Sequence, residues 1–415
     1  MKYFHWENTY IEQLSGVEKK KFTQEIKIIK YLYVNGPKTN AELCRHLKIS
    51  APKSFSLLNE LIENNMIEKQ GLGESIGGRK PDLYGIKDNS LFVLSIDMNK
   101  YKTRMSIFDN NNTNITGLHT YSLPLDNDIK TVEKLADYAN ELIENSGIDP
   151  SKLIGIGISM PGLVDSVQGI NYTYLNYEDK SVRDILQKRF NRPVFIENDA
   201  KAAALAEFRF GKAKGKKDVL VIFLDWGIGL GLILNGKLYR GTSGFAGEFS
   251  HIPMIEDGIL CHCGKHGCLE TVASGTAVTR LVKEGIKSGK SSILNTITND
   301  SLEKIDVKQV IDAAWGGDQF AINILSEIGF NLGKGIAVLI QLYNPELIIL
   351  GGRVSEARQY ITTPIDQSLN IYCMQQIRDK AAIVVSELGQ SMGIMGAVAI
   401  IMENIFENYL KLVQK

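Results

Sequence analysis

The sequence predicts an α/β protein with two similar lobes, preceded by a small domain that is mostly helical. Apolar residues keep helical spacing from Phe22 to Ile62, whereas strand-like runs alternate with helical ones from about Leu91 onward. The chain has 415 residues, 44% hydrophobic content and zero formal net charge, which is sufficient for two or three domains with cores of their own. We therefore expect a first domain at 1–88 and lobes at 89–205 and 206–415.

Three short helices are expected in the first domain. The first helix carries its apolar face at Phe22, Ile26, Ile29 and Tyr33. Thr39 and Glu42 have the spacing of a capping box, which begins the second helix. Ser50 is expected to cap the third helix. The predicted inward residues of that helix are Phe55, Leu58, Leu61 and Ile62, and its predicted outward residues are Lys53, Ser54, Ser56 and Asn59. This succession is typical of a helix-turn-helix.

Two strand-like runs follow the third helix, at 66–70 and 82–86, and the glycine-rich segment between them carries Arg79 and Lys80. A basic, extended wing of this kind fits the narrow minor groove of DNA. The first 88 residues hold 14 Lys and Arg against 11 Asp and Glu, and a surplus of three is too small to indicate nucleic acid by itself. The combined pattern predicts a winged helix-turn-helix DNA-binding domain; a protein-docking module is the alternative.

The order of strands and helices repeats after residue 89. The first lobe has a predicted hairpin at 91–97 and 103–108, a helix at 131–145 and a strand at 153–159. The second has predicted strands at 219–224 and 230–234, a long helix near 322–343 and a strand at 347–350. Two similar lobes predict a ligand cleft between them.

Three of the five cysteines, Cys261, Cys263 and Cys268, lie within eight residues, and His251 precedes them by ten. Three thiolates and one imidazole are the donors of a closed, structural Zn²⁺ site. A disulfide between Cys261 and Cys263 would be strained. His262 and His266 are rival donors to His251, and a reduced, metal-free loop is the alternative.

Several motifs together resemble the ROK family of repressors, open reading frames and sugar kinases, which belongs to the actin-like and hexokinase-like ATPases. They are Cys-x-Cys-Gly-x-x-Gly-Cys-x-Glu at 261–270, Glu-x-x-His at 248–251, Asn-Gly-Lys-Leu-Tyr-Arg-Gly at 235–241, Glu-Asn-Asp-Ala at 197–200 and Leu-Gly-Gly at 350–352. The resemblance implies a two-lobed, ribonuclease H-like fold whose C-terminal helix returns toward the first lobe. It points to the branch of xylose and N-acetylglucosamine repressors.

The resemblance also implies a sugar site. Asn198 and Asp199 match the pair that binds sugar hydroxyls, and in the family's kinases the aspartate accepts the proton of the attacking hydroxyl. Glu248, His251 and Glu270 match family residues that bind the hydroxyls of the sugar ring. Pro161 and Gly162 match a loop that lines the same pocket in the family. Carboxylates and an amide suit a polyol because they form paired hydrogen bonds. A helix-capping role is the structural alternative for Asp199.

The two phosphate loops depart from the kinase pattern. Where family kinases have Asp-x-Gly-Gly-Thr, this chain has Asp-Met-Asn-Lys-Tyr at 97–101, and the second loop begins Asp225-Trp226 in place of small residues. An added acid and added volume are expected to exclude a triphosphate. Asp199 would then be a vestigial base in a protein that is no enzyme. Ser250 replaces a family glycine and leaves the identity of the sugar open.

The expected function is therefore that of a cytoplasmic, sugar-responsive transcriptional repressor. It would bind operator DNA as a homodimer or homotetramer, with a sugar or sugar phosphate as effector. An ATP-dependent sugar kinase with an accessory DNA-binding head is the alternative, and a partner protein as effector is a weaker one. We expect no membrane association, because no apolar run approaches the ~20 residues that span a bilayer and the first residues lack the apolar segment of a signal peptide.

Overall fold

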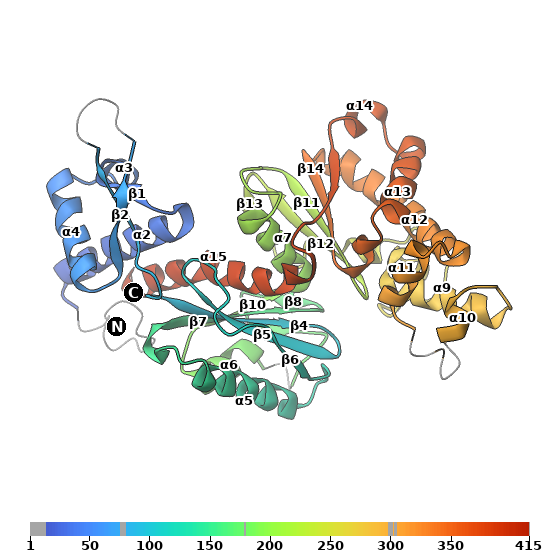
Figure 1. The fold of residues 1–415 in the computed structure, drawn as a ribbon, viewed down its shortest axis with the longest axis horizontal. Coiled ribbons are helices and arrows are strands. Elements are labelled where there is room, and N and C mark those ends of the chain that lie inside the picture. The colour runs from blue at the N-terminus through green and yellow to red at the C-terminus, as the bar shows by residue number, and fades with distance from the viewer. Residues whose placement is uncertain (1–13, 75–79, 178–179, 298–301, 303–304, 415) are drawn as a thin grey trace. The chain divides into compact units, whose positions relative to one another are not determined.

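A computed structural model describes residues 14–74, 80–177, 180–297, 302 and 305–414 (Figure 1). The chain divides into two compact units, one of Met1–Glu197 with Ala397–Lys415 and the other of Asn198–Gly396. The winged head and the first lobe lie in the first unit. The division falls at Asn198, eight residues before the start that the sequence suggested for the second lobe, and the end of the C-terminal helix groups with the first unit.

The head contains the three expected helices and a three-stranded sheet. The helices are α2 (Gly16–Asn35), α3 (Asn40–Leu47) and α4 (Ala51–Glu63), and the strands are β1 (Lys38–Thr39), β2 (Ile67–Leu72) and β3 (Asp82–Ile86). The capping box is present, because the Thr39 hydroxyl accepts from the Glu42 amide at 3.3 Å and the Glu42 carboxylate accepts from the Thr39 amide at 2.8 Å. β2 and β3 form the expected hairpin. β1 adds to β3 and was not predicted, because two residues show no periodicity.

The face that α4 presents to the core differs from the prediction. Ser54 is fully buried, whereas Phe55 is 46% exposed. Each residue advances a helix by about 100°, so Ser54 shares the buried face with Leu57, Leu58 and Leu61. The predictions that Phe55 lies inward and that Ser54 lies outward were therefore wrong.

The two lobes are built on five-stranded sheets of one plan. The strands of the first are β4 (Phe92–Met98), β5 (Lys102–Asp109), β6 (His119–Ser122), β7 (Leu153–Met160) and β10 (Val194–Asn198). Those of the second are β11 (Val219–Leu224), β12 (Ile228–Leu234), β13 (Lys237–Leu238), β14 (Leu347–Gly351) and β15 (Ala382–Val385). The orders β10-β7-β4-β5-β6 and β15-β14-β11-β12-β13 correspond strand by strand. Each sheet pairs an antiparallel hairpin with a parallel neighbour, which confirms the predicted repetition.

Helices cover both faces of the first sheet (Figure 1). α5 (Ile129–Asn145) and α6 (Val182–Phe190) pack on one face, and α15 (Met392–Gln414) packs on the other. Gly157 of β7 permits the close approach of α15, since a Cβ there would lie 2.1 Å from the Ala397 carbonyl oxygen. α15 also contacts the head, where Glu407 pairs with Lys30 and the Phe406 ring meets the Tyr33 ring edge-on at 5.4 Å. Short elements complete this unit at η1 (Pro150–Lys152), β8 (Val164–Asp165) and β9 (Ile170–Asn171).

The second unit packs its helices on a core that includes the central strands β11 and β14. Its α-helices are α7 (Asp199–Phe210), α8 (Glu270–Ala273), α9 (Gly275–Lys287), α10 (Leu294–Ile297), α11 (Val307–Trp315), α12 (Gln319–Tyr343), α13 (Gln359–Tyr372) and α14 (Gln375–Arg378), and its 3-10 helices are η2 (Phe249–His251), η4 (Arg353–Ala357) and η5 (Gly389–Ser391). Gly329 and Gly333 let α12 lie against α13 at close range.

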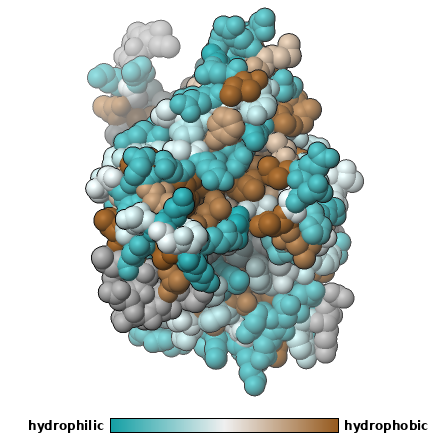
Figure 2. Space-filling model, turned by 90° about the vertical axis from the view of Figure 1, so that its right-hand side faces the viewer, coloured by the Kyte–Doolittle hydropathy of each residue, from teal (hydrophilic) through white to brown (hydrophobic). Residues whose placement is uncertain are grey.

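Two apolar segments have the length and composition of membrane spans, Gln319–Tyr343 and Gly389–Val413, each with mean hydropathy 1.2. The protein buries 56% of an apolar 18-residue window in the first segment and 67% of such a window in the second, and α12 supplies Leu325, Ile328 and Leu332 to the core. Both are therefore explained as core helices. Figure 2 shows one face of the molecule, on which apolar residues are interspersed with polar ones.

Candidate functional site

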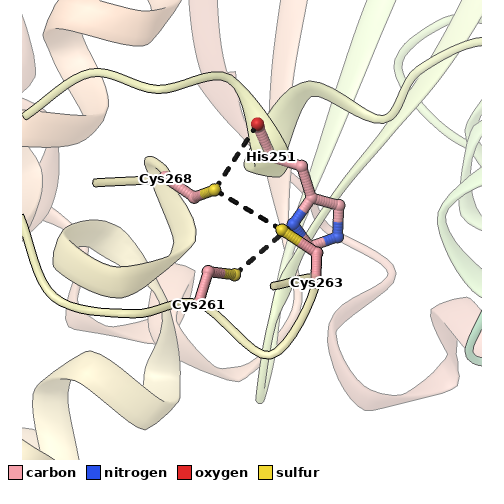
Figure 3. A group of neighbouring side chains, drawn as sticks. All are labelled: His251, Cys261, Cys263 and Cys268. Atoms are coloured by element: carbon pink, nitrogen blue, oxygen red, sulfur yellow. Dashed lines mark hydrogen bonds between the residues drawn. The ribbon is translucent and has the colours of Figure 1, made fainter. Parts of the chain in front are cut away.

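Four side chains of the second unit, His251, Cys261, Cys263 and Cys268, converge on one point (Figure 3). Their donor atoms all lie within 4.8 Å of one another. Cys263 Sγ is 3.6 Å from Cys268 Sγ, and Cys261 Sγ is 3.6 Å from His251 Nδ1. Nitrogen and sulfur atoms that bind one tetrahedral ion, each at about 2.0–2.3 Å from the ion, lie about 3.6–3.8 Å from one another. The two sulfur atoms of a disulfide lie about 2.05 Å apart. The cluster can hold a metal ion, and its cysteines are free thiols.

Tight turns bring the three thiols together. The Gly264 amide donates to the Cys261 carbonyl at 2.9 Å, and the Cys261 amide donates to the Lys265 carbonyl at 2.7 Å. Gly267 has φ +71°, and a Cβ there would lie 1.9 Å from the Ile255 carbonyl oxygen. Only glycine satisfies both conditions. The metal-binding loop, residues 261–268, therefore depends on this glycine for its shape.

Of the three candidate histidines, His251 belongs to the four-donor cluster. His266 interacts through Nδ1 with the Gly258 carbonyl oxygen at 3.1 Å. His262 belongs to a different group, with Cys261 and Glu270. The donor set that sequence predicted is thus the set that converges.

Burial acts on the thiols of the cluster. Desolvation raises the pKa of Cys268 to about 12 and also raises the pKa of Cys261. A hydrogen bond from the Lys265 amide lowers the pKa of Cys263. Because a metal ion binds thiolates, its binding must release protons from the two buried thiols.

The start of α7 carries the matched pair Asn198 and Asp199. The Asn198 side chain accepts from the amides of Ala200 at 3.0 Å and Lys201 at 3.3 Å, so Asn198 is the N-cap of this helix. Asp199 is the first helical residue, and its carboxylate accepts from the Ala200 amide at 2.8 Å. A helix-capping role was the alternative expected for Asp199, but Asn198 caps this helix instead.

Glu248 lies beside the first turn of α7. Desolvation raises its pKa, Lys201 and His251 oppose that shift, and Glu270 adds to it. Glu248 is exposed to solvent when the whole residue is considered. Its carboxyl group is nevertheless partly desolvated by these neighbouring groups. Lys201 itself is buried, and its ammonium donates to the Gly244 carbonyl at 2.8 Å. Glu248, His251, Glu270 and the start of α7 thus form one polar cluster.

The turn before Glu248 depends on Gly247. Its φ is +96°, and a Cβ there would lie 2.2 Å from the Leu230 carbonyl oxygen of β12. Phe249 and Ser250 on the far side are buried. The chain is therefore fixed immediately before and after the Glu248 carboxylate.

Pro161 and Gly162, also matched to the sugar pocket, follow β7 in the first unit. The Asn171 side-chain amide donates to the Pro161 carbonyl at 2.9 Å. Gly162 has φ +98°, and a Cβ there would lie 2.8 Å from the Thr173 Cβ. This loop requires glycine and has a defined shape.

Acids of both phosphate loops are bound by arginines of their own unit. In the first hairpin, Arg104 donates to Asp97 at 3.0 and 2.5 Å, as their cross-strand register requires. The Asn99 side chain accepts from the amides of Tyr101 and Lys102 at 3.0 and 2.8 Å. These two backbone amides therefore form hydrogen bonds within the turn.

The second loop is bound in the same manner. Arg353 donates to Asp225 at 2.5 Å, and its guanidinium lies 5.0 Å from the centre of the Trp226 ring. β11 and β14 run parallel with Phe223 opposite Gly351, which brings the residues after both strands to one edge. Because Arg353 pairs with Asp225, the charge repulsion that this acid would exert on a triphosphate is smaller than the sequence suggested.

The predicted DNA-contacting residues have different surroundings. Lys53, Ser56 and Asn59 are exposed on α4, and Lys80 is exposed in the wing, just before β3. Ser54 is buried, and Arg79 lies outside the described residues. Phe55 is exposed with the α4 polar residues and was missed, because its apolar character favoured a core position.

Three other residues of interest were not predicted as site residues: Lys201, His262 and Arg353. A lysine within the alanine-rich turn at 200–204 was the available signal for the first. The partners of Arg353 and His262 are set by tertiary structure, and no spacing in the sequence indicates them.

Two sequence models match the chain, the ROK family at residues 93–404 and a winged helix-turn-helix DNA-binding domain at residues 23–68. The chain is 30% identical to the xylose repressor of Bacillus spizizenii, over 94% of this chain and 97% of that protein. It is 37% identical to the glucokinase of Halalkalibacterium halodurans, over 63% of this chain and 80% of that protein.

A solved structure gives the same assignment. The crystal structure of a ROK family transcriptional regulator, described as a homolog of the E. coli MLC protein, matches 95% of this chain and 100% of its own, with a TM-score of 0.79 and 26% identity. The family match runs from the first strand of the first lobe into α15. The chain therefore belongs to the ROK family.

Proposed function

We propose that this protein is a transcriptional repressor that binds operator DNA through its winged head and responds to a sugar bound by the ROK body. Three features together carry the proposal. They are the winged head, a polar cluster that can bind sugar hydroxyls, and phosphate loops whose acidic residues pair with arginines of the protein. The match to a xylose repressor over both domains supports it. Its site of action would be the cytoplasm, where the DNA is.

In this proposal α4 enters the major groove of the operator. Lys53, Ser56 and Asn59 would donate to phosphates and base edges, and Phe55 would contact a thymine methyl group. Arg79 and Lys80 of the wing would contact the adjacent minor groove. Two heads are needed to bind a two-fold symmetric operator, so we propose that the protein is a homodimer or a homotetramer. Light scattering distinguishes the two by their molar mass.

The proposed effector site uses the polar cluster of the second unit. Asn198, Asp199, Glu248, His251 and Glu270 would bind ring hydroxyls of a sugar or sugar phosphate. These groups offer several acceptors and an amide, which match the alternating donors and acceptors of a polyol. Two carboxylates increase the strength of the hydrogen bonds that they accept.

We propose Zn²⁺ as the ion held by the Cys–His cluster. Three sulfur donors and one imidazole favour zinc among the common divalent ions, and four protein donors make the site structural. His251 Nδ1 faces Cys261, so His251 Nε2 remains as the ring atom that could meet a sugar hydroxyl. The ion would hold the loop that presents Glu270.

We infer that the protein lacks kinase activity. The Arg353 guanidinium lies 5.0 Å from the centre of the Trp226 ring at the second loop, and Asn99 accepts from the amides of the first turn. A triphosphate would have to displace these contacts before it could bind. The kinase alternative is favoured by Asp199, which retains the position of a base.

The experiment that tests the repressor proposal measures DNA binding with and without sugar. Operator sequences are selected from random DNA with the purified protein, and their affinity is then measured with D-glucose, D-xylose and N-acetylglucosamine. At least one sugar is expected to change the affinity fivefold or more, because a ligand shifts an equilibrium only through unequal affinity for two states. Glu248→Gln should reduce this response and leave the affinity of the sugar-free protein unchanged. Absence of selected DNA, or equal affinity with every sugar, contradicts the proposal.

The kinase alternative makes a separate prediction. Incubation with Mg²⁺-ATP and each of the three sugars is expected to give no sugar phosphate above the background of the Asp199→Asn variant. The reason is that both phosphate loops bind protein groups in place of phosphate. Turnover by the natural sequence that Asp199→Asn abolishes would establish the kinase instead.

A further inference from the structure

His262 reaches from the metal-binding loop to a carboxylate of the proposed sugar site. Its ring Nδ1 lies 3.0 Å from Glu270 Oε1. The His262 side chain is 68% exposed, whereas that of Glu270 is 13% exposed. An exposed ring on a short loop thus contacts a largely buried carboxylate.

Glu270 is held from two directions. Its Oε1 faces His262, and its Oε2 accepts from the Ile228 amide at 3.4 Å. Gly227 leaves room for this arrangement, since a Cβ there would lie 2.9 Å from Glu270 Oε2. The amide contact, at 3.4 Å, is the longer of the two, so His262 is the closer neighbour of the carboxylate.

The position of His262 is fixed by its neighbours in the chain. It lies between Cys261 and Cys263, which both belong to the metal-binding cluster. Its ring also meets the His251 ring edge-on, with 5.1 Å between centroids. The backbone of His262 therefore moves only if the cluster moves, and the ring connects the cluster to Glu270.

The 3.0 Å separation between His262 Nδ1 and Glu270 Oε1 is within the range of a hydrogen bond, and the same Nδ1 lies 3.8 Å from Cys261 Sγ. An ionised carboxylate only accepts, so a hydrogen bond to Glu270 requires the hydrogen on Nδ1. Each carboxylate oxygen has two acceptor positions, so one contact on Oε1 leaves capacity for a sugar hydroxyl. The ring can thus hold Glu270 without competing with a ligand.

On the basis of the proposed sugar site, we propose that His262 is a positioning and specificity-determining residue, which orients the Glu270 carboxylate toward one hydroxyl of the sugar. Loss of the ring leaves Glu270 free to rotate, so the hydrogen bond to that hydroxyl becomes weaker. Sugars that place a hydroxyl against Glu270 lose affinity, and sugars that do not are unaffected. The ring is no metal ligand in this proposal, because His251 completes the four donors.

The experiment is a double-mutant cycle measured by calorimetry with D-glucose, D-xylose and N-acetylglucosamine. The proteins are the natural sequence, His262→Ala, His262→Asn, Glu270→Ala and His262→Ala with Glu270→Ala. For the tightest-binding sugar, His262→Ala is expected to raise Kd about tenfold, which corresponds to one hydrogen bond to a charged group. His262→Asn should restore Kd to within about threefold, because the asparagine amide nitrogen occupies the position of Nδ1. The His262→Ala change should have no further effect when Glu270 is already alanine.

Two controls separate positioning from a structural role. Lys265→Ala, at an exposed site on the same loop, should leave Kd unchanged. Metal content and the melting temperature of the sugar-free protein should be the same for His262→Ala and the natural sequence. Loss of metal from His262→Ala would overturn the proposal by making His262 a ligand.

Other outcomes are equally decisive. The positioning role would be overturned if His262→Ala left the sugar Kd unchanged. It would also be overturned if His262→Ala weakened sugar binding equally in the natural sequence and in the Glu270→Ala variant. Both results leave the proposed sugar site intact. Failure of the natural sequence to bind any of the three sugars would overturn the proposed sugar site, and the positioning role with it.

Discussion

Replacement of Cys263 by serine is expected to remove the bound metal ion and to weaken sugar binding by at least tenfold. A hydroxyl is a poor zinc ligand, so three donors remain where four are needed. Without the ion, the loop between His251 and Glu270 loses the constraint that fixes both of these proposed sugar ligands. Residues that orient a bound group through a second contact typically change affinity by 10–100-fold when they are removed. Metal analysis and calorimetry with the three sugars measure the two effects.

Cys263 is the most suitable cysteine for this test because it is exposed, whereas Cys261 and Cys268 are buried. The substitution therefore leaves no cavity in the core. Cys373→Ser is the matched control, since Cys373 lies outside the cluster. It should retain the ion and the sugar affinity. Loss of the ion with an unchanged sugar Kd would show that the loop does not organise the sugar site.

Replacement of Asn59 by alanine is expected to weaken operator binding by about 5- to 150-fold and to relax sequence preference at one position. Asn59 is exposed on α4, on the face that would meet the major groove. A base contact in that groove contributes roughly 1–3 kcal/mol of discrimination, and 1.4 kcal/mol corresponds to about a factor of ten in affinity. Binding assays with the selected operator and its single-base variants measure both effects.

Ser54→Ala is the matched control on the same helix. The Ser54 hydroxyl is buried without a hydrogen-bond partner among the described residues, so its removal relieves a desolvated polar group. Operator affinity should be unchanged, and the head should be equally or more stable. A loss of operator binding in Ser54→Ala at unchanged stability would contradict the orientation of α4 described above.

The helices of the head and the β2–β3 pairing were predicted well because their signals are local. The capping box at Thr39 and Glu42 involves groups three residues apart, and the hairpin at 67–86 follows from two apolar runs with a glycine-rich connection. The orientation of α4 was not predictable to one residue. Phe55 is more apolar than Ser54, so composition favoured it for the core, but the helix period places Ser54 with Leu57 and Leu61.

The four predicted metal donors converge in the structure, whereas the bonds around the phosphate loops could be predicted only in part. The pair Asp97 and Arg104 follows from hairpin register and could have been predicted. The pair Asp225 and Arg353 could not, because its partners are 128 residues apart and meet only through the parallel pairing of β11 with β14.

By itself, the sequence determined the family, the order of the elements and the capping box of α3, and it predicted the four side chains that converge in the second unit. All of these depend on residue type and on spacing within a few turns or one loop. The tertiary structure alone decided that Asn198 caps α7, that Ser54 is buried, that Arg353 binds Asp225 and that His262 lies beside Glu270, and it left Ser50 before α4 without a side-chain capping bond. Such contacts depend on how helices rotate against a core and on which strands become neighbours, and both are set by packing of the whole unit.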